Sequence, residues 1–289
     1  MFQSLSRSWS LVKASGAVLK QDKELLMFPL ISALATLVVI ACFALPIFGL
    51  GALDGLSNAE TTAEDDSLLS LLAVALAFLF YVALYFVIFF FNAALVGAAM
   101  MRFDGGDPTV SDGLRIAMSK FGSILGYACI AATVGMILRA IQERVGFVGK
   151  IVVGLLGAGW TVATYMVAPV LVARDVGPFD AIKESAGLLK KTWGENIVGQ
   201  AGIGVVFVLI QFALLFGGGV LVAVAVSTGS GVVVGLTAVL VLAAVILAAL
   251  IQAALGGIYA AALYRFADTG ENSSGFDAGV LQLAFAPKA

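Results

Sequence analysis

The feature that most constrains this chain is its long runs of sequence without charge. No Asp, Glu, Lys or Arg occurs between Leu68 and Met101 or between Ile197 and Tyr264. A helix that spans a membrane needs about 20 consecutive apolar residues. Of the 289 residues, 61% are hydrophobic and 12% are charged, whereas soluble domains have about 45–50% apolar and about 25% charged residues. The sequence therefore predicts an all-α integral membrane protein.

Length and flanking residues divide the apolar sequence into six predicted spans. They cover residues 25–53, 68–101, 121–138, 148–173, 197–226 and 232–264. The second stretch would be about 51 Å long, against a hydrocarbon core of about 30 Å, so it is expected to tilt strongly or to project beyond the bilayer. Pro46 is expected to bend or end the first helix. The glycines Gly217–Gly219 are expected to form a packing notch, and a break in the fifth helix is the alternative.

The basic residues lie mainly on one side of these spans. Of the 16 Lys and Arg residues, 13 fall in the N-terminal segment, the second-to-third and fourth-to-fifth connections and the C-terminal segment. Only Arg139, Arg144 and Lys150 fall on the other side. Because short cytoplasmic loops carry an excess of Lys and Arg, both termini are expected to be cytoplasmic.

The chain has no histidine, and its two cysteines, Cys42 and Cys129, each lie in an apolar stretch. The commonest general base and the commonest metal ligand are therefore missing. The cysteines lack the paired spacing of a metal or redox motif. Residues 39–42 imitate a lipoprotein cleavage box, but the apolar run is longer than a typical signal core, so Cys42 is expected to be a core residue. We expect no catalytic, cofactor or metal site, no enzyme activity and, with a net charge of −2, no nucleic-acid partner.

A short amphipathic segment precedes each odd-numbered span, and we call these three segments the collar. In the first, apolar residues including Trp9 recur at helical spacing, and the other two begin near Pro108 and Pro178, as suits the first turn of a helix. Each even-numbered span ends on a similar phrase, at residues 98–104, 170–175 and 261–268. We therefore predict one membrane domain, 1–289, built from three repeats at about 1–104, 105–175 and 176–268, with a tail at 269–289. Convergence is the alternative, because every cytoplasmic helix end favours a basic residue.

Three segments carry a resemblance to a known family: Ser6–Lys13, Asp22–Pro29 and Leu283–Lys288. They resemble an uncharacterised bacterial family, the domain-of-unknown-function family 6159, over nearly the whole chain. The resemblance implies a multi-pass topology in the bacterial inner membrane and supplies no established activity. The repeated plan more loosely resembles the membrane domain attached to some glycerophosphodiester phosphodiesterases.

No ionisable residue lies near the middle of a predicted span, which argues against a proton-coupled pump. The candidates for a polar pathway are uncharged: Asn92, Thr164, Gln211 and Gln252. The favoured alternative is hydrogen bonding between helices, worth about 0.6 kcal/mol for each bond.

Two smaller features complete the predicted sites. Arg139 and Glu143 are expected to form an i,i+4 ion pair rather than an external anion site. Three aromatic residues are expected to anchor the collar at headgroup depth: Trp9, Phe121 and Trp193.

Two function classes remain open. The leading hypothesis is a non-enzymatic scaffold that organises membrane lipids or partner proteins through the collar, with other membrane proteins or a second copy as candidate partners. The alternative is a channel or permease for a small uncharged or zwitterionic solute. A packed centre would favour the scaffold, and a continuous polar cavity would favour the permease.

Overall fold

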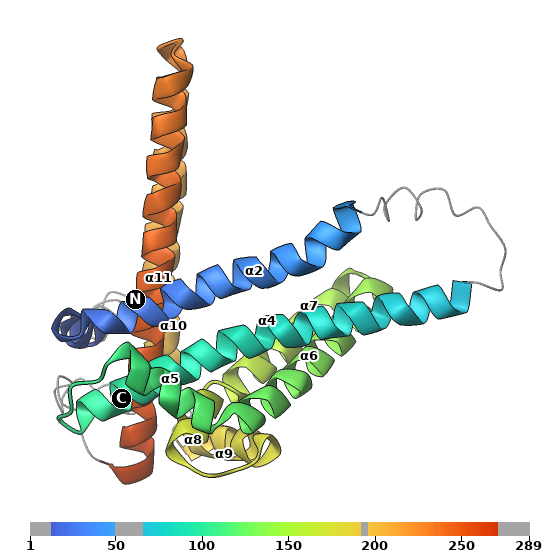
Figure 1. Cartoon of the computed structure of the whole chain (residues 1–289), viewed down its shortest axis with the longest axis vertical. Coiled ribbons are helices and arrows are strands. Elements are labelled where there is room, and N and C mark those ends of the chain that lie inside the picture. The colour runs from blue at the N-terminus through green and yellow to red at the C-terminus, as the bar shows by residue number, and fades with distance from the viewer. Residues whose placement is uncertain (1–12, 50–65, 192–195, 271–289) are drawn as a thin grey trace. The chain divides into compact units, whose positions relative to one another are not determined.

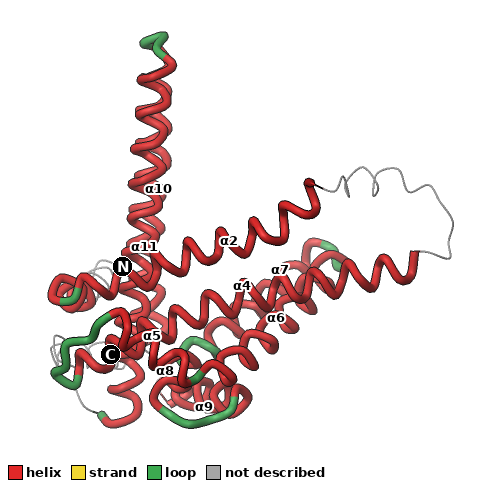
Figure 2. The backbone as a smooth tube through the Cα atoms, viewed as in Figure 1, coloured by secondary structure: helices red, strands yellow, loops and turns green. Residues whose placement is uncertain are grey.

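The chain folds into helices joined by short connections (Figure 1). The computed structural model describes residues 13–49, 66–191 and 196–270, and in these ranges all regular structure is helical (Figure 2). Six helical stretches among the described residues are long and apolar enough to cross a membrane. The predicted all-α membrane architecture is confirmed.

The elements follow the alternation of amphipathic and apolar sequence. A helical segment at 13–21 precedes the following helices: η1 (Lys23–Leu26), α2 (Met27–Gly49), α4 (Asp66–Phe103), α5 (Val110–Ser119), α6 (Phe121–Arg144), α7 (Phe147–Ala163), α8 (Val167–Ala173), α9 (Pro178–Lys191), α10 (Asn196–Ser227) and α11 (Gly231–Thr269). The short amphipathic helices α5 and α9 each precede a span, as predicted.

Three prolines lie at or near the expected helix boundaries. Helix α2 continues past Pro46 to Gly49, so Pro46 does not end the first helix. Helix α5 begins at Val110 rather than at Pro108, whereas α9 begins at Pro178 as predicted.

The fourth predicted span is not one continuous helix. Helix α7 ends at Ala163 and α8 begins at Val167. The cause is Pro169, because a proline has no N–H to donate to the carbonyl four residues earlier and its ring clashes with that carbonyl. The fourth span predicted over 148–173 is present as Phe147–Ala173, with a turn at residues 164–166 that was not predicted.

The fifth and sixth spans form an antiparallel hairpin, in which α10 is continuous through Gly217–Gly219. The alternative of a break in this helix is wrong. A Cβ atom at Gly218 would overlap the side chain of Val241 on α11, whereas Gly217 and Gly219 face open space. The predicted packing notch is thus confirmed at Gly218.

The chain divides into two compact units, which we describe separately. One comprises Met1–Pro29, Leu95–Val110 and Gly187–Ala289, and the other Leu30–Ala94 and Ser111–Ala186. In the first unit the described core includes Leu25, Phe28, Val96, Ile258 and Leu263. In the second it includes Ile124, Tyr127, Met166, Leu171 and Ala181.

Candidate functional site

Most ion pairs of the described residues lie at the helix ends that carry Arg102, Lys120, Arg174 and Arg265, which we call the basic ends. The apolar stretches 68–101 and 197–264 contain no charged side chain, so these ends carry the charged groups that flank them. The contacts of each compact unit are taken in turn below.

In the unit that holds α7 and α8, one serine side chain fills the break in the fourth span. Ser185, on α9, is fully buried. Its hydroxyl oxygen accepts the N–H of Met166 at 3.0 Å and donates to the carbonyl of Ala163 at 2.7 Å. A buried backbone group without a partner costs about 1–3 kcal/mol. Ser185 therefore supplies a partner for two backbone groups at the break.

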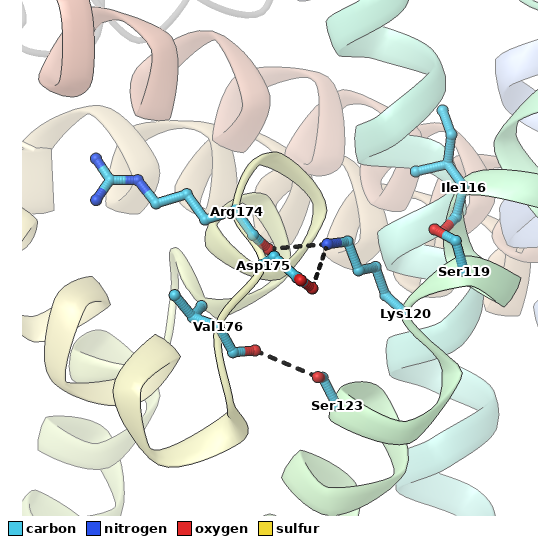
Figure 3. Close-up of polar contacts among 7 residues, drawn as sticks. All are labelled: Ile116, Ser119, Lys120, Ser123, Arg174, Asp175 and Val176. Atoms are coloured by element: carbon cyan, nitrogen blue, oxygen red, sulfur yellow. Dashed lines mark hydrogen bonds and ion pairs between the residues drawn. The ribbon is translucent and has the colours of Figure 1, made fainter.

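A lysine holds the end of the same span (Figure 3). The ammonium group of Lys120 donates to the carbonyl of Arg174 at 3.1 Å and lies 3.2 Å from a carboxylate oxygen of Asp175. The Ser123 hydroxyl donates to the carbonyl of Val176 at 3.2 Å. A cation at a helix C-terminus is favoured by the helix dipole, so Lys120 fastens the start of α6 to the end of α8.

Two further contacts fix α9 against this unit. Arg174 forms an ion pair with Glu184 on α9. A Cβ atom at Gly126 would lie 3.0 Å from Cγ of Pro178, so the glycine allows the start of α9 to approach α6 closely. Helix α9 is therefore bound to the basic ends of both α6 and α8.

In the other unit, Arg102 organises the turn that follows α4. Its Nε lies 3.1 Å from Oδ2 of Asp22, and its Nη1 donates to the carbonyl of Gly106 at 3.0 Å and to Asp107 at 3.2 Å. Gly105 supports the turn with a φ of 84°, a conformation that glycine adopts without strain. Arg102 thus joins the N-terminal segment to the end of the second span.

Two longer-range contacts extend this cluster. Nη1 of Arg265, at the end of α11, lies 2.6 Å from Oδ1 of Asp104. The Arg265–Asp104 pair joins two of the similar phrases that the sequence contains. The carboxylate of Glu24 accepts the N–H of Val110 at 3.0 Å, which satisfies one of the free N–H groups at the start of α5.

Asp22 is the buried acidic residue of this cluster. Its exposed fraction is 6%, and its Oδ2 atom has the ion pair with Arg102 but no aligned hydrogen bond. Burial raises the pKa of Asp22 above its usual range, and the nearby charge of Arg102 opposes this shift. Burial prevails because it removes water from the carboxylate.

The collar helices bury small residues and expose a mixed basic and apolar face. Helix α5 buries Gly113 and Ala117, and helix α9 buries the small residues Ala181 and Ser185 together with Leu188 and Leu189. On the outer face of α9, Phe179 is 72% exposed and Lys183 is exposed four residues later. Small residues on the inner face let each helix lie close to the span ends.

Helix α5 has a comparable outer face. The side chain of Arg115 is 79% exposed, and Met118 is 60% exposed. These two residues are three positions apart and therefore lie on one side of the helix. Both collar helices thus present a cation beside an exposed apolar side chain.

The four polar-pathway candidates fall into different units. Asn92 and Thr164 belong to one unit, and Gln211 and Gln252 belong to the other. The Thr164 hydroxyl donates to the carbonyl of Trp160 on its own helix at 2.8 Å. Nε2 of Gln211 donates across the hairpin to the carbonyl of Val245 at 3.2 Å. Only the Gln211 contact is an interhelical bond of the kind that the sequence favoured.

The headgroup depth expected of the three aromatic anchors stays a prediction. Trp9 and Trp193 lie outside the described residues. Phe121 is 42% exposed, and its ring lies 5.0 Å from that of Phe86.

The ion pair expected near the far end of α6 is present. Nε of Arg139 lies 3.0 Å from Oε1 of Glu143, as predicted. Nη1 of Arg139 also donates to the hydroxyl of Tyr81 on α4 at 2.7 Å. Within the described ranges, no three Cys, Asp or Glu side chains are grouped to hold a metal ion.

Comparison with protein families gives a match over most of the chain. The family of unknown function DUF6159 matches residues 71–276. A comparison with curated proteins gives no match.

Proposed function

This chain belongs to the family of unknown function DUF6159, and we propose that it is a non-enzymatic scaffold of the bacterial inner membrane that organises anionic lipids through its collar. A partner protein that binds the collar is the alternative to lipid. Both termini and the basic ends are cytoplasmic in this proposal, because 13 of the 16 Lys and Arg residues belong to that side.

The outer face of α9 is the observation that carries the proposal. Phe179 is 72% exposed and is followed at helical spacing by the exposed ammonium groups of Lys183 and Lys190. An aromatic ring can enter the boundary between headgroups and acyl chains while lysines contact lipid phosphates. Each Lys near an anionic leaflet contributes about 1 kcal/mol to binding.

The fastening of α9 gives this face a fixed place. Ser185 and Glu184 hold the inner side of the helix to the end of the fourth span. An outer face that cannot reorient loses less conformational entropy when lipids bind to it. The contacts of Ser185 and Glu184 therefore support a lipid-binding role for Phe179 and Lys183.

Lipid selectivity in reconstituted vesicles tests the proposal. Spin-labelled phosphatidylglycerol and phosphatidylcholine would each be added at trace level, and the fraction immobilised by the protein would be measured by electron spin resonance. We expect severalfold preference for phosphatidylglycerol, and a clear loss of that preference in the double variant Lys183→Gln, Lys190→Gln. Lys150→Gln, an exposed lysine at the start of α7, is the matched control and should retain the preference.

Two other results of these measurements would contradict or redirect the proposal. Equal immobilisation of both lipids by the wild-type protein would contradict lipid organisation. Site-specific crosslinking from position 179 to a protein, with no lipid preference, would assign the same surface to a partner protein.

The broken fourth span favours a second candidate, the permease. Interrupted membrane helices often line substrate sites in transporters, and Thr164 lies at the break. Ser185 already pairs with the groups at this break, so we favour the scaffold. Flux of a small neutral or zwitterionic solute into vesicles, abolished by the triple variant Asn92→Leu, Gln211→Leu, Gln252→Leu with folding intact, would establish the permease instead.

A further inference from the structure

The three collar segments bury and expose their residues in the same order, and α9 has the fullest version of it. Its buried positions include Ala181, Ser185 and Leu188, whose spacings of four and three form one stripe along a helix. Lys183 and Lys190 are exposed. Lys183 lies two residues before Ser185, which is about 200° around the helix axis. This cation therefore points away from the side that holds α9 to the protein.

The N-terminal helical segment has the same order. Ser15 is fully buried, whereas Lys13 and Lys20 are exposed. The sequences agree as well, because Lys, Ser, Leu and Lys recur at the same places in residues 13–20 and 183–190. The two segments therefore correspond residue by residue, and each carries two exposed cations seven positions apart.

Helix α5 follows this order over a shorter length. Gly113 and Ala117 are buried, at the spacing of the two small residues that α9 buries. The side chain of Arg115, two residues before Ala117, is 79% exposed. Seven residues after Arg115 the chain has already entered α6. Helix α5 therefore has one such cation where the other two segments have two.

We infer that the collar holds three corresponding sites for the phosphate of an anionic lipid, centred on Lys13, Arg115 and Lys183. This inference rests on the proposed function and deepens it, because it extends lipid binding from α9 to the other two collar segments. In each case an apolar helix begins within a few residues of the segment, which places the cation beside the membrane surface. Cations beside a membrane span attract the phosphates of anionic lipids.

Lipid fits this repeated pattern better than a partner protein does. A single partner protein recognises one surface, and such recognition does not require the same pattern on three separate helices. Lipids surround a membrane protein and can occupy three corresponding sites at once. The recurrence of the cation therefore favours lipid as the ligand of all three segments.

The three sites should differ in strength. Each cation near an anionic lipid raises the association constant by about fivefold. Helix α5 should be the weakest site, because it has one cation, and Asp112 lies 3.7 Å from Arg115 and competes with the phosphate. The N-terminal segment and α9 should have similar strength. The double variant Lys183→Gln, Lys190→Gln should therefore lower the lipid preference without abolishing it.

Counting bound lipids by native mass spectrometry tests the inference. The full chain in detergent would be titrated with phosphatidylglycerol and, separately, with phosphatidylcholine. We expect the wild-type protein to retain three phosphatidylglycerol molecules in excess of phosphatidylcholine, one for each collar segment.

Matched variants assign each lipid to a segment. The double variants Lys13→Gln, Lys20→Gln and Lys183→Gln, Lys190→Gln should each lower the number of bound lipids by one, and Arg115→Gln should remove the most weakly bound lipid. Lys150→Gln, at an exposed lysine outside the collar, should retain all three. Because the replaced side chains are exposed, circular dichroism should show unchanged folding in every variant.

Failure of the inference can be told apart from failure of the proposed function. If only the α9 double variant loses lipid and the other collar variants match the wild type, the three-site inference is overturned while the proposed function stands. If the wild type retains both lipids equally, the proposed function fails and the inference fails with it. Crosslinks from positions 13 and 115 to a protein, with no change in lipid number, would assign those segments to a partner protein and overturn the inference.

Discussion

The hydroxyl oxygen of Ser185 accepts the N–H of Met166 at 3.0 Å, across 19 residues of sequence. The same hydroxyl donates to the carbonyl of Ala163, so one side chain replaces hydrogen bonds that the helix cannot make before Pro169. The contact links the collar to the only broken span among the described residues. The place of α9 against the fourth span and the shape of that span are thus set together.

Ser185→Ala should lower the free energy of unfolding by about 1–3 kcal/mol, because it leaves two buried backbone groups without a partner. Unfolding in detergent, followed by circular dichroism, would measure the change. Ser119→Ala is the matched control, since that hydroxyl donates only to Ile116 within its own exposed turn. The double variant Pro169→Ala, Ser185→Ala should recover part of the loss, because alanine restores the missing N–H. Equal stability of Ser185→Ala and the wild type would contradict this explanation.

Lys120→Gln should destabilise the unit that contains α6 and α8 by about 1 kcal/mol, because the end of α8 loses a cation that favours its dipole. Thermal unfolding would report the change. Arg115→Gln should change stability by less than about 0.5 kcal/mol, because its partner Asp112 is 3.7 Å away in an exposed i,i+3 pair. A larger loss of stability in Arg115→Gln than in Lys120→Gln would contradict the role of Lys120 in holding α6 to α8.

Asp22 should make stability depend on pH in the acidic range. Its folded pKa lies above the ordinary value of 3.8, because burial outweighs the attraction of Arg102. The ionised carboxylate therefore costs stability above the raised pKa, and this cost disappears as the pH falls from that value towards 3.8. Unfolding measured from about pH 7 to about pH 3.5 should show less dependence on pH in Asp22→Asn. Asp180→Asn, at an exposed position on α9, is the control, and identical profiles for Asp22→Asn and the wild type would refute the assignment.

Gly218→Ala should destabilise the α10–α11 hairpin by about 1–3 kcal/mol, because the new methyl group would overlap Val241. Its neighbours Gly217 and Gly219 face open space, so Gly217→Ala and Gly219→Ala should not have this cost. The three variants differ in one methyl group each, which isolates the contact. Comparable loss in all three would mean that glycine is needed here for another reason.

The sequence predicts the spans well because apolar length and charge are local properties. Helices α10 and α11 lie within a few residues of their predicted ends. Helix α11 ends at Thr269 because Gly270 adopts a left-handed conformation, with a φ of 71°, that suits glycine. Arg139 and Glu143 also pair as their spacing of four predicts.

Contacts between residues distant in sequence could not be predicted, because they depend on how the helices pack. Pro169 is visible in the sequence, but the long apolar run around it does not indicate where the helix is interrupted. Nothing local indicates that Ser185 would fill the resulting break, or that Glu24 would accept the N–H of Val110. Gly218 could not be distinguished from Gly217 and Gly219, because only the position of Val241 separates them.

Cysteine labelling in intact bacterial cells tests most directly the claim that the collar faces the cytoplasm. After replacement of Cys42 and Cys129, single cysteines would be introduced at Gln142 and Lys183, which are both exposed. Lys183 is a better site than Ser185, whose side chain is fully buried. A membrane-impermeant maleimide should label position 142 in intact cells and position 183 only after the cells are opened. Labelling of position 183 from outside would contradict the account.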